Sequence, residues 1–227
     1  MKQIVAIDGP SGAGKSTLAR ELAKRLGYQH LDTGAMYRAV AVAARRAGVG
    51  LDDSRGLNRL CKNIEIRFEH SSGGNRVLLN GEDVSRIIRT PEMSSASSAV
   101  SAVSEVRLHM VRLQRKLGRG GGVVAEGRDI GTVVFPDTRA KFYLDASVEE
   151  RARRRWLELK KKGMAEPFDR VLADIEKRDR DDSTRVDSPL RRAEDAIYVD
   201  STSMGPEEVL NLICRVVKDL EGGDENN

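Results

Sequence analysis

The stretch that decides the fold is GPSGAGKS, at Gly9–Ser16, which fits the phosphate-loop pattern G-x-x-x-x-G-K-[ST] without a mismatch. The apolar run IVAI before it is typical of a buried strand, and residues 16–26 after it have helical periodicity. Glycines let successive backbone N–H groups turn toward a phosphate, and the start of the helix adds its positive dipole end. The sequence therefore predicts a nucleoside-triphosphate site in which Lys15 reaches the β- and γ-phosphates and the Ser16 hydroxyl ligates Mg²⁺.

The remaining strands extend this α/β pattern. Further short runs of buried-strand character alternate with helical segments and lie at residues 29–31, 123–126, 141–145 and 197–200. Five strands that alternate with helices favour a single parallel sheet with helices on both faces.

One region breaks the alternation of strands and helices. Ile64, Ile66 and Phe68 alternate with charged residues, and the pair Asn80-Gly81 further along is a strong hairpin signal. We therefore expect a small antiparallel β insertion within an α/β core. The expected boundaries are 62–88 for the insertion, 1–61 and 89–221 for the core, and 222–227 for a disordered tail.

The composition limits the class of protein and of partner. Of 227 residues, 39% are hydrophobic and 33% are charged, as in a soluble globular protein. No stretch approaches the roughly 18 consecutive apolar residues of a membrane helix. Because the N-terminus also lacks a signal peptide, we expect a cytoplasmic protein without a membrane partner. The net charge of +4 suits an anionic partner, either a nucleic acid or a small phosphorylated molecule.

The phosphate loop by itself does not say how the triphosphate is used. A GTPase usually carries N-K-x-D for guanine, and no Asn-Lys pair occurs in this chain. A kinase for a small molecule needs a second anion site for its phosphate acceptor, and arginines at the ends of strands could form one.

Two arginines follow strands at the edge where α/β sheets bind ligands. Arg38 comes after the strand at 29–31, and Arg128 with Asp129 comes after the strand at 123–126. An arginine there can donate two parallel hydrogen bonds to a phosphate, and an aspartate can accept one from a base amino group. The alternatives are an ordinary capped helix with an exposed Arg38, and a surface ion pair of Arg128 with Asp129.

Two helical segments in the second half of the chain carry more arginines. Arg151, Arg154 and Arg155 share one face of the helix that starts near Ser147, and this face is either solvated or part of a mobile lid within residues 151–170. If residues 168–185 form one helix, the core-facing stripe becomes charged near its end. That stripe consists of Val171, Ile175, Arg178, Asp182 and Arg185, whereas Lys177, Arg180 and Asp181 point elsewhere.

Together these motifs resemble the bacterial-type cytidylate kinases, which are nucleoside-monophosphate kinases of the phosphate-loop class. The residues that carry the resemblance are IDGPSGAGKST at 7–17, LDTGAMYR at 31–38, the stretch at 80–92, EGRDIGTVVFPD at 126–137, the stretch at 142–155, and the R-D-D-R spacing within 178–185. The resemblance implies a five-stranded parallel core, a nucleotide-acceptor insertion and a helical lid.

The resemblance also implies roles for individual residues. ATP and its Mg²⁺ would be held by Gly9, Pro10, Ser11, Gly12, Ala13, Gly14, Lys15, Ser16 and Thr17. CMP or dCMP would be bound by Thr33, Tyr37, Arg38, Ser98, Arg107, Arg128, Asp129, Arg178, Asp182 and Arg185. The residues expected to act on the transferred phosphoryl group are Lys15, Arg128, Arg154, Arg155 and Arg185.

Within the CMP set, the implied contacts differ by position. Arg38, Arg128 and Arg185 would bind the acceptor phosphate, and Arg178 and Asp182 would bind its sugar. The cytosine edge would be recognised by Ser98, Arg107 and Asp129, since Asp129 can accept from the N4 amino group while the other two donate. Departures from the family pattern are mild: Thr33 where serine is common, Ser16 where some members have glycine, and Glu126 where others have aspartate.

Two alternatives to a CMP kinase remain open at this point. One is a kinase for another small phosphate acceptor such as UMP. The other is an ATPase stimulated by nucleic acid, although four Phe, four Tyr and one Trp leave few side chains for base stacking. We therefore expect small nucleotides as partners, no nucleic acid, and a monomer.

Overall fold

The computed structural model describes residues 2–71, 74–164 and 166–222. The chain divides into two compact units, one of residues 1–31 and 118–227 and the other of residues 32–117.

The first unit is organised around β1 (Ile4–Asp8), the strand that leads into the phosphate loop. The sheet has the strand order β2-β6-β1-β7-β8. Its other strands are β2 (Gln29–Asp32), β6 (Val123–Gly127), β7 (Ala140–Asp145) and β8 (Ile197–Asp200). β1 pairs in parallel with β6 and β7, and β7 pairs in parallel with β8. The predicted five-stranded parallel sheet is confirmed, and the carboxyl ends of β1, β6 and β7 meet at one edge.

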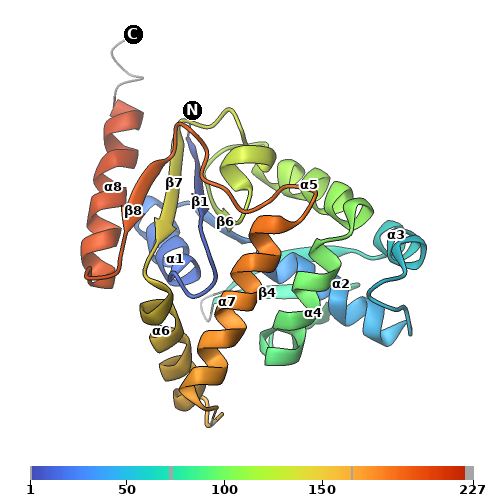
Figure 1. Ribbon diagram of the computed structural model, residues 1–227. Helices are drawn as coiled ribbons and strands as arrows, with labels where there is room; N and C mark the ends of the chain where they lie inside the picture. Colours follow the sequence, from blue (N-terminus) through green and yellow to red (C-terminus); the bar gives the residue numbers. More distant parts are fainter. Residues whose placement is uncertain (1, 72–73, 165, 223–227) are drawn as a thin grey trace. The chain divides into compact units, whose positions relative to one another are not determined.

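Two helices cover one face of this sheet. α1 (Lys15–Leu26) and α8 (Pro206–Gly222) lie beside each other along it (Figure 1). Leu22 of α1 and Ile213 of α8 are fully buried against Ile7 and Phe142 of the strands. Burial of each such side chain contributes about 1.5–3 kcal/mol and fixes the direction of α1 behind the phosphate loop.

Two expectations for the end of the chain are corrected. β8 is an edge strand in which Val199 is buried, whereas Ile197 and Tyr198 are exposed, because it has a neighbouring strand on one side only. Gly222 belongs to α8 and not to a disordered tail, and residues 223–227 of that predicted tail lie outside the described residues.

The predicted lid, within residues 151–170, includes most of one helix and the first residues of the next, and these two neighbouring helices, called the lid helices below, follow the carboxyl end of β7 (Figure 1). They are α6 (Val148–Lys161) and α7 (Phe168–Thr184). α7 ends one residue before the predicted end, and Arg185 has extended backbone with φ −63° and ψ 146°. The hydroxyls of Ser183 and Thr184 donate to carbonyls of the preceding turn, at 2.6 Å to Asp179 and 2.7 Å to Arg180. Such local bonds favour the end of a helix.

The second unit combines helices with a three-stranded antiparallel sheet. Its elements are α2 (Thr33–Arg46), α3 (Ser54–Asn63), β3 (Ile66–Ser71), β4 (Gly74–Leu79), β5 (Glu82–Asp83), the 3-10 turn η1 (Ile87–Arg89), α4 (Pro91–Ser101) and α5 (Ser104–Gly118). Asn80 and Gly81 both have positive φ, 51° and 84°, as the two central residues of a tight hairpin require. The antiparallel sheet is therefore confirmed, and residues 72–73, between β3 and β4, lie outside the described residues.

In the parts of the chain that the structure describes, we find no helix that combines the length and the apolar composition needed to cross a bilayer.

Candidate active site

The phosphate loop turns between β1 and α1 on glycines. Gly12 and Gly14 have φ of 79° and 94°, a region that side chains other than glycine rarely adopt. Gly9 has no space for a Cβ atom, which would collide with the carbonyl oxygen of Leu144 in β7. Because Gly14 is the residue before the first turn of α1, the first N–H groups of that helix lack intrahelical partners and can bind an anion.

Lys15 is buried within this loop. Its Nζ donates to the carbonyl oxygen of Pro10 at 2.6 Å. Burial lowers the pKa of Lys15 well below its ordinary value, and the charge of Arg128 lowers it further. Phosphate oxygens beside these cations would favour the charged form of the lysine, because an anion reverses the sign of the local potential.

Ser16, in the first turn of α1, joins the loop to β6. Its hydroxyl donates to Oε2 of Glu126 at 2.7 Å, and Nε2 of His30 lies 3.0 Å from the other carboxylate oxygen. Glu126 is itself buried. A hydroxyl and a carboxylate side by side are the hard oxygen ligands that Mg²⁺ prefers.

Arginines and aspartates from β6, α7 and the loops after them form an ionic cluster in the first unit. Nε of Arg128 donates to Oδ2 of Asp182 at 2.7 Å. Nη1 of Arg185 lies 3.9 Å from Oδ1 of Asp182, and its Nη2 lies 4.0 Å from Oδ1 of Asp129. Burial by itself raises the pKa of Asp182, but Arg128, Arg178 and Arg185 outweigh it and hold the pKa below the ordinary value. The structure therefore brings together the predicted ligands Arg128, Asp129, Arg178, Asp182 and Arg185.

Asp8, the last residue of β1, holds the segment that follows Arg128 and Asp129. Its two carboxylate oxygens accept from the backbone N–H groups of Ile130 and Gly131, at 2.8 and 2.7 Å. Those residues begin η2 (Ile130–Val134), a single π-helical turn. Burial raises the pKa of Asp8 to about 6, although the two N–H groups oppose this shift.

The two predicted lid arginines have different surroundings. The guanidinium of Arg154 donates to the carbonyl and hydroxyl oxygens of Ser201, at 2.6 and 3.0 Å, and its Nε donates to Glu150 at 2.8 Å. Arg155 pairs with Glu158 on the surface of α6 at 2.8 Å. Arg154 thus connects α6 to the loop after β8, and contact of either arginine with a phosphoryl group stays a prediction.

The other predicted CMP ligands belong to the second unit. Arg38 donates to Asp32 at 2.9 Å, and Asp32 also caps α2 by accepting from the N–H of Ala35 at 2.8 Å. The guanidinium of Arg107 lies over the ring of Tyr37, 5.6 Å from its centroid. Thr33, Tyr37 and Arg107 are buried, and Ser98 is partly buried.

Arg107 is also tied to α4. Its Nη1 donates to the carbonyl oxygen of Ser101 at 3.1 Å, and the hydroxyl of Ser101 donates to the carbonyl oxygen of Ser98 at 2.9 Å. These bonds link two of the predicted base-recognition residues, Ser98 and Arg107, through the end of one helix.

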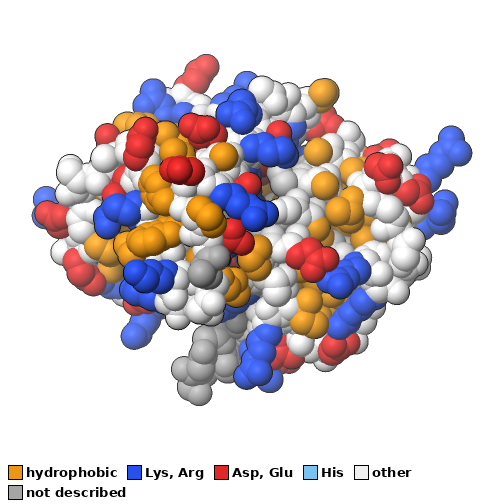
Figure 2. Space-filling view, turned by 60° about the horizontal axis from the view of Figure 1, so that its bottom comes forward, with side chains coloured by type: hydrophobic (Ala, Val, Ile, Leu, Met, Phe, Trp, Pro, Cys, Tyr) orange, Lys and Arg blue, Asp and Glu red, His pale blue; other side chains and the backbone are white. Residues whose placement is uncertain are grey.

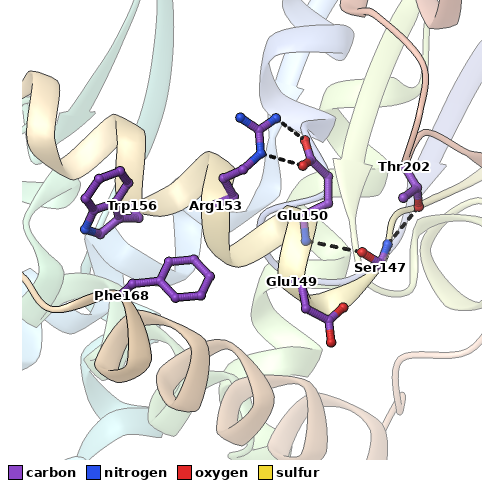
Figure 3. A pocket seen from close by; sticks show the side chains of 7 residues that line it. All are labelled: Ser147, Glu149, Glu150, Arg153, Trp156, Phe168 and Thr202. Atoms are coloured by element: carbon purple, nitrogen blue, oxygen red, sulfur yellow. Dashed lines mark hydrogen bonds and ion pairs between the residues drawn. The ribbon is translucent and has the colours of Figure 1, made fainter.

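An open cavity of about 440 Å³ lies in the lid region between α6, α7 and the loop after β8 (Figure 3). It is lined by Ser147, Glu149, Glu150, Arg153, Trp156, Phe168 and Thr202. Figure 3 shows the rings of Trp156 and Phe168 on one side and the capping bond from the N–H of Glu150 to Ser147 on the other. None of these residues is among the predicted ligands.

Several residues that hold the site have no role among the sequence-based predictions. Asp8 could have been noticed, because it stands between the apolar run of β1 and Gly9. Asp179 contacts Ser11 of the phosphate loop from a position 168 residues away, and no local spacing signals such a contact. Arg151, which the spacing places on one helix face with Arg154 and Arg155, also contacts Ser11, and that long-range partner has no local signal either.

Comparison with known proteins gives a consistent result. A family model described as cytidylate kinase matches residues 5–219. A cytidylate kinase of Geobacter sp. (strain M21) is 56% identical over 98% of this chain and 96% of its own length. A cytidylate kinase of Syntrophotalea carbinolica is 56% identical over 96% of this chain and 93% of its own length.

A solved structure of an uncharacterised protein from Eubacterium ventriosum covers 96% of this chain and 99% of its own, with a TM-score of 0.51 and 10% identity, which is a likeness of fold alone. The full-length sequence matches, together with the phosphate loop and the Arg128–Asp182 cluster, establish that this chain belongs to the cytidylate kinase family.

Proposed function

We propose that this enzyme transfers the γ-phosphoryl group of ATP to CMP or dCMP, giving CDP or dCDP and ADP. The observation that carries the proposal is the cluster of Arg128, Asp182 and Arg185 in the same compact unit as the phosphate loop of Lys15. A phosphate loop accounts for ATP, and a second group of arginines provides for a second anion. Family membership supports cytidine monophosphate as the acceptor.

The chemistry places few demands on proton transfer. An oxygen of the acceptor phosphate attacks the γ-phosphorus in line and the bond to the β-phosphate oxygen breaks, so the phosphoryl group passes from ATP to CMP and ADP leaves. No strong general base is needed, because the acceptor phosphate is largely ionised at pH 7. Lys15, Arg128 and Arg185 stabilise the charge that builds up on the transferred group. Arg154 and Arg155 complete this environment when the lid closes and excludes water.

We further propose that Mg²⁺ binds with ATP beside Ser16. The Ser16 hydroxyl and the buried Glu126 carboxylate are 2.7 Å apart and supply oxygen ligands, directly or through water. When bound, the ion neutralises phosphate charge. His30 orients the carboxylate by its contact with the second oxygen.

The proposed base recognition matches the hydrogen-bonding pattern of cytosine. Asp129 accepts from the N4 amino group, and Ser98 and Arg107 donate to N3 and O2. Uracil has an acceptor at position 4 and a donor at N3. Uracil would therefore set an acceptor against the Asp129 carboxylate and a donor against the donors of Ser98 and Arg107, so UMP should be the poorer substrate. We assign Arg178 and Asp182 to the acceptor sugar. We assign Thr33, Tyr37 and Arg38 to the nucleotide and its phosphate.

The deciding experiment is an assay of ADP formation with CMP, dCMP, UMP, AMP and GMP as acceptors. We expect CMP and dCMP to be phosphorylated most efficiently. Comparable turnover of UMP would favour the alternative acceptor, and a purine nucleotide as the best substrate would overturn the base assignment.

The alternative of an ATPase stimulated by nucleic acid has little support. On the face drawn in Figure 2, lysine and arginine side chains are interspersed with aspartate and glutamate. Exposed arginines also pair with carboxylates, as Arg45 does with Glu92. Nucleic-acid surfaces instead gather basic residues on one face. Addition of DNA or RNA should leave ATP turnover unchanged.

We also propose that the protein is cytoplasmic and monomeric. Sedimentation at micromolar concentration tests the oligomeric state.

A further inference from the structure

One residue of the phosphate loop, Ser11, is bound at both its N–H and its carbonyl oxygen by an ion pair between α6 and α7. The N–H of Ser11 donates to Oδ1 of Asp179 at 3.3 Å, and its carbonyl oxygen accepts from Nη1 of Arg151 at 3.1 Å. Arg151 and Asp179 also contact each other directly. We call this arrangement of Arg151 and Asp179 around Ser11 the Ser11 bracket.

The Ser11 bracket is built into both lid helices. Arg151 lies in the first turn of α6, is buried, and donates through Nε to the carbonyl oxygen of Ala146 at 2.9 Å. Asp179 lies in α7, next to the predicted sugar ligand Arg178. One guanidinium therefore connects the end of β7, the phosphate loop and α7. A lysine ammonium is a compact point charge and does not spread its donors over two nitrogens in this way.

The adjacent glycine shows how closely the loop packs against these helices. A Cβ atom on Gly12 would lie 2.9 Å from the carbonyl oxygen of Arg151 and 3.2 Å from Cδ1 of Ile175. The loop is thus fixed by side-chain hydrogen bonds at Ser11 and by packing at Gly12. Its shape depends on where α6 and α7 lie.

We propose that Arg151 and Asp179 are positioning residues that set the conformation of the ATP loop and couple it to the lid helices. The Ser11 N–H is engaged by Asp179, so the bracket determines which loop N–H groups remain for the phosphates of ATP. Neither side chain needs to touch a substrate. The inference rests on the proposed kinase activity, and it predicts an effect on ATP that is larger than the effect on CMP.

The test compares Asp179→Asn with Asp181→Asn. Asparagine keeps the shape of Asp179 but removes its charge, whereas Asp181 is an exposed residue of the same helix that pairs with Lys177 at 2.9 Å. We expect Asp179→Asn to raise the Kd of a non-hydrolysable ATP analogue about tenfold, as for loss of a charged hydrogen bond. The Kd of CMP should change less than about twofold on the same scale. Asp181→Asn should match wild type in both.

A double-mutant cycle with Arg151→Lys separates positioning from general damage. If the two residues act as one bracket, the double variant should bind the ATP analogue no more weakly than the worse single variant. Additive losses, equal losses for ATP and CMP, or unchanged ATP binding in Asp179→Asn would each overturn the proposal. If Arg151→Lys does not fold, Asp179→Glu gives the same comparison of ATP with CMP. Wild-type protein that does not phosphorylate CMP would instead contradict the proposed function.

Discussion

Arg128 and Asp182, which are 54 positions apart in the chain, form a hydrogen-bonded ion pair of 2.7 Å between the end of β6 and the last turn of α7. Asp182 is only 4% exposed, so its charge is stabilised by arginines and not by water. The pair fixes Nε of Arg128, and Nη1 also donates to the carbonyl oxygen of Gly127 at 3.4 Å. A guanidinium has five N–H donors, so it can still donate to a phosphate beside these two bonds.

Removal of this carboxylate should therefore weaken the use of CMP. In Asp182→Asn, Arg128 loses a charged hydrogen-bond partner and Arg185 loses a carboxylate 3.9 Å from its Nη1, so both arginines become less well ordered. We expect kcat/KM for CMP to fall at least about tenfold, as for loss of a hydrogen bond between charged groups. ATP-analogue binding should be retained. Steady-state kinetics with CMP varied at saturating ATP measure the effect, and equal kcat/KM in variant and wild type would contradict the assigned role.

Arg178 offers a second test of the same face of α7. Its truncation in Arg178→Ala should weaken CMP use while ATP binding is spared, because the residue is assigned to the acceptor sugar. Arg180→Ala is the matched control, since Arg180 lies on the exposed face of the same helix. If both variants lose activity equally, the distinction between an inner and an outer face of α7 has no functional meaning.

Lys15→Ala should lower kcat by about two to three orders of magnitude, the usual effect of losing one preorganised charge that stabilises a transition state. Lys24→Ala, in the exposed last turn of the same helix, should leave kcat unchanged. Rapid-quench or coupled assays measure kcat directly. Near-normal turnover in Lys15→Ala would show that the loop does not bind the transferred phosphate as proposed.

Asp8 should make stability depend on pH in the direction opposite to most carboxylates. Its folded pKa, about 6, lies above the ordinary value, so between about pH 4 and 6 the folded state binds more protons than the unfolded state. The free energy of unfolding should therefore gain from this group as pH falls through that window, by on the order of 3 kcal/mol for about two pKa units. Above pH 6 that contribution is absent.

Asp8→Asn should remove this pH-dependent contribution. Urea unfolding of variant and wild type at pH 4.5 and 7 gives the difference, with the exposed Asp137→Asn as control. Other carboxylates change the free energy of unfolding with pH in both proteins. The contribution of Asp8 is therefore the difference between the pH dependence of wild type and that of Asp8→Asn. Parallel pH profiles for Asp8→Asn and wild type would contradict the raised pKa.

Glu126→Gln should change the requirement for Mg²⁺. The amide keeps the size of the side chain but removes the charge next to the Ser16 hydroxyl, so a divalent cation should bind more weakly. We expect the Mg²⁺ concentration at half-maximal activity to rise about 10-fold or more. Titration with Mn²⁺ followed by its paramagnetic signal measures the affinity without turnover. An unchanged Mn²⁺ affinity would place the metal away from Glu126.

The sequence predicted much of the fold because local chemistry specifies it. The loop from Gly9 to Ser16 needs glycines for its backbone angles, and Asn80-Gly81 needs positive φ at both positions, so each motif predicts its own structure. Buried parallel strands are short apolar runs that can be recognised directly. The prediction of a buried strand is wrong for β8, because its partly apolar sequence does not reveal that it has a neighbouring strand on one side only.

Helical periodicity also separated most exposed residues from buried ones correctly in the last turns of α7. Lys177, Arg180 and Asp181 are exposed, and Asp182 is buried. The prediction was wrong for the backbone of Arg185, which is extended, although its side chain still reaches Asp129 and Asp182. A regular helix places residues by a period of 3.6, and that rule stops at the helix end.

By itself, the sequence determined the phosphate loop, the α/β alternation, the hairpin and the family, since these follow from residues that are close together along the chain. Only the tertiary structure decided that Asp8 holds η2, that Asp182 pairs with Arg128, and that Arg151 and Asp179 enclose Ser11. The physical reason is that a buried polar group must find a partner at about 3 Å, wherever in the sequence that partner lies. Local patterns show that a charge is turned inward, and the packed chain determines which charge it meets.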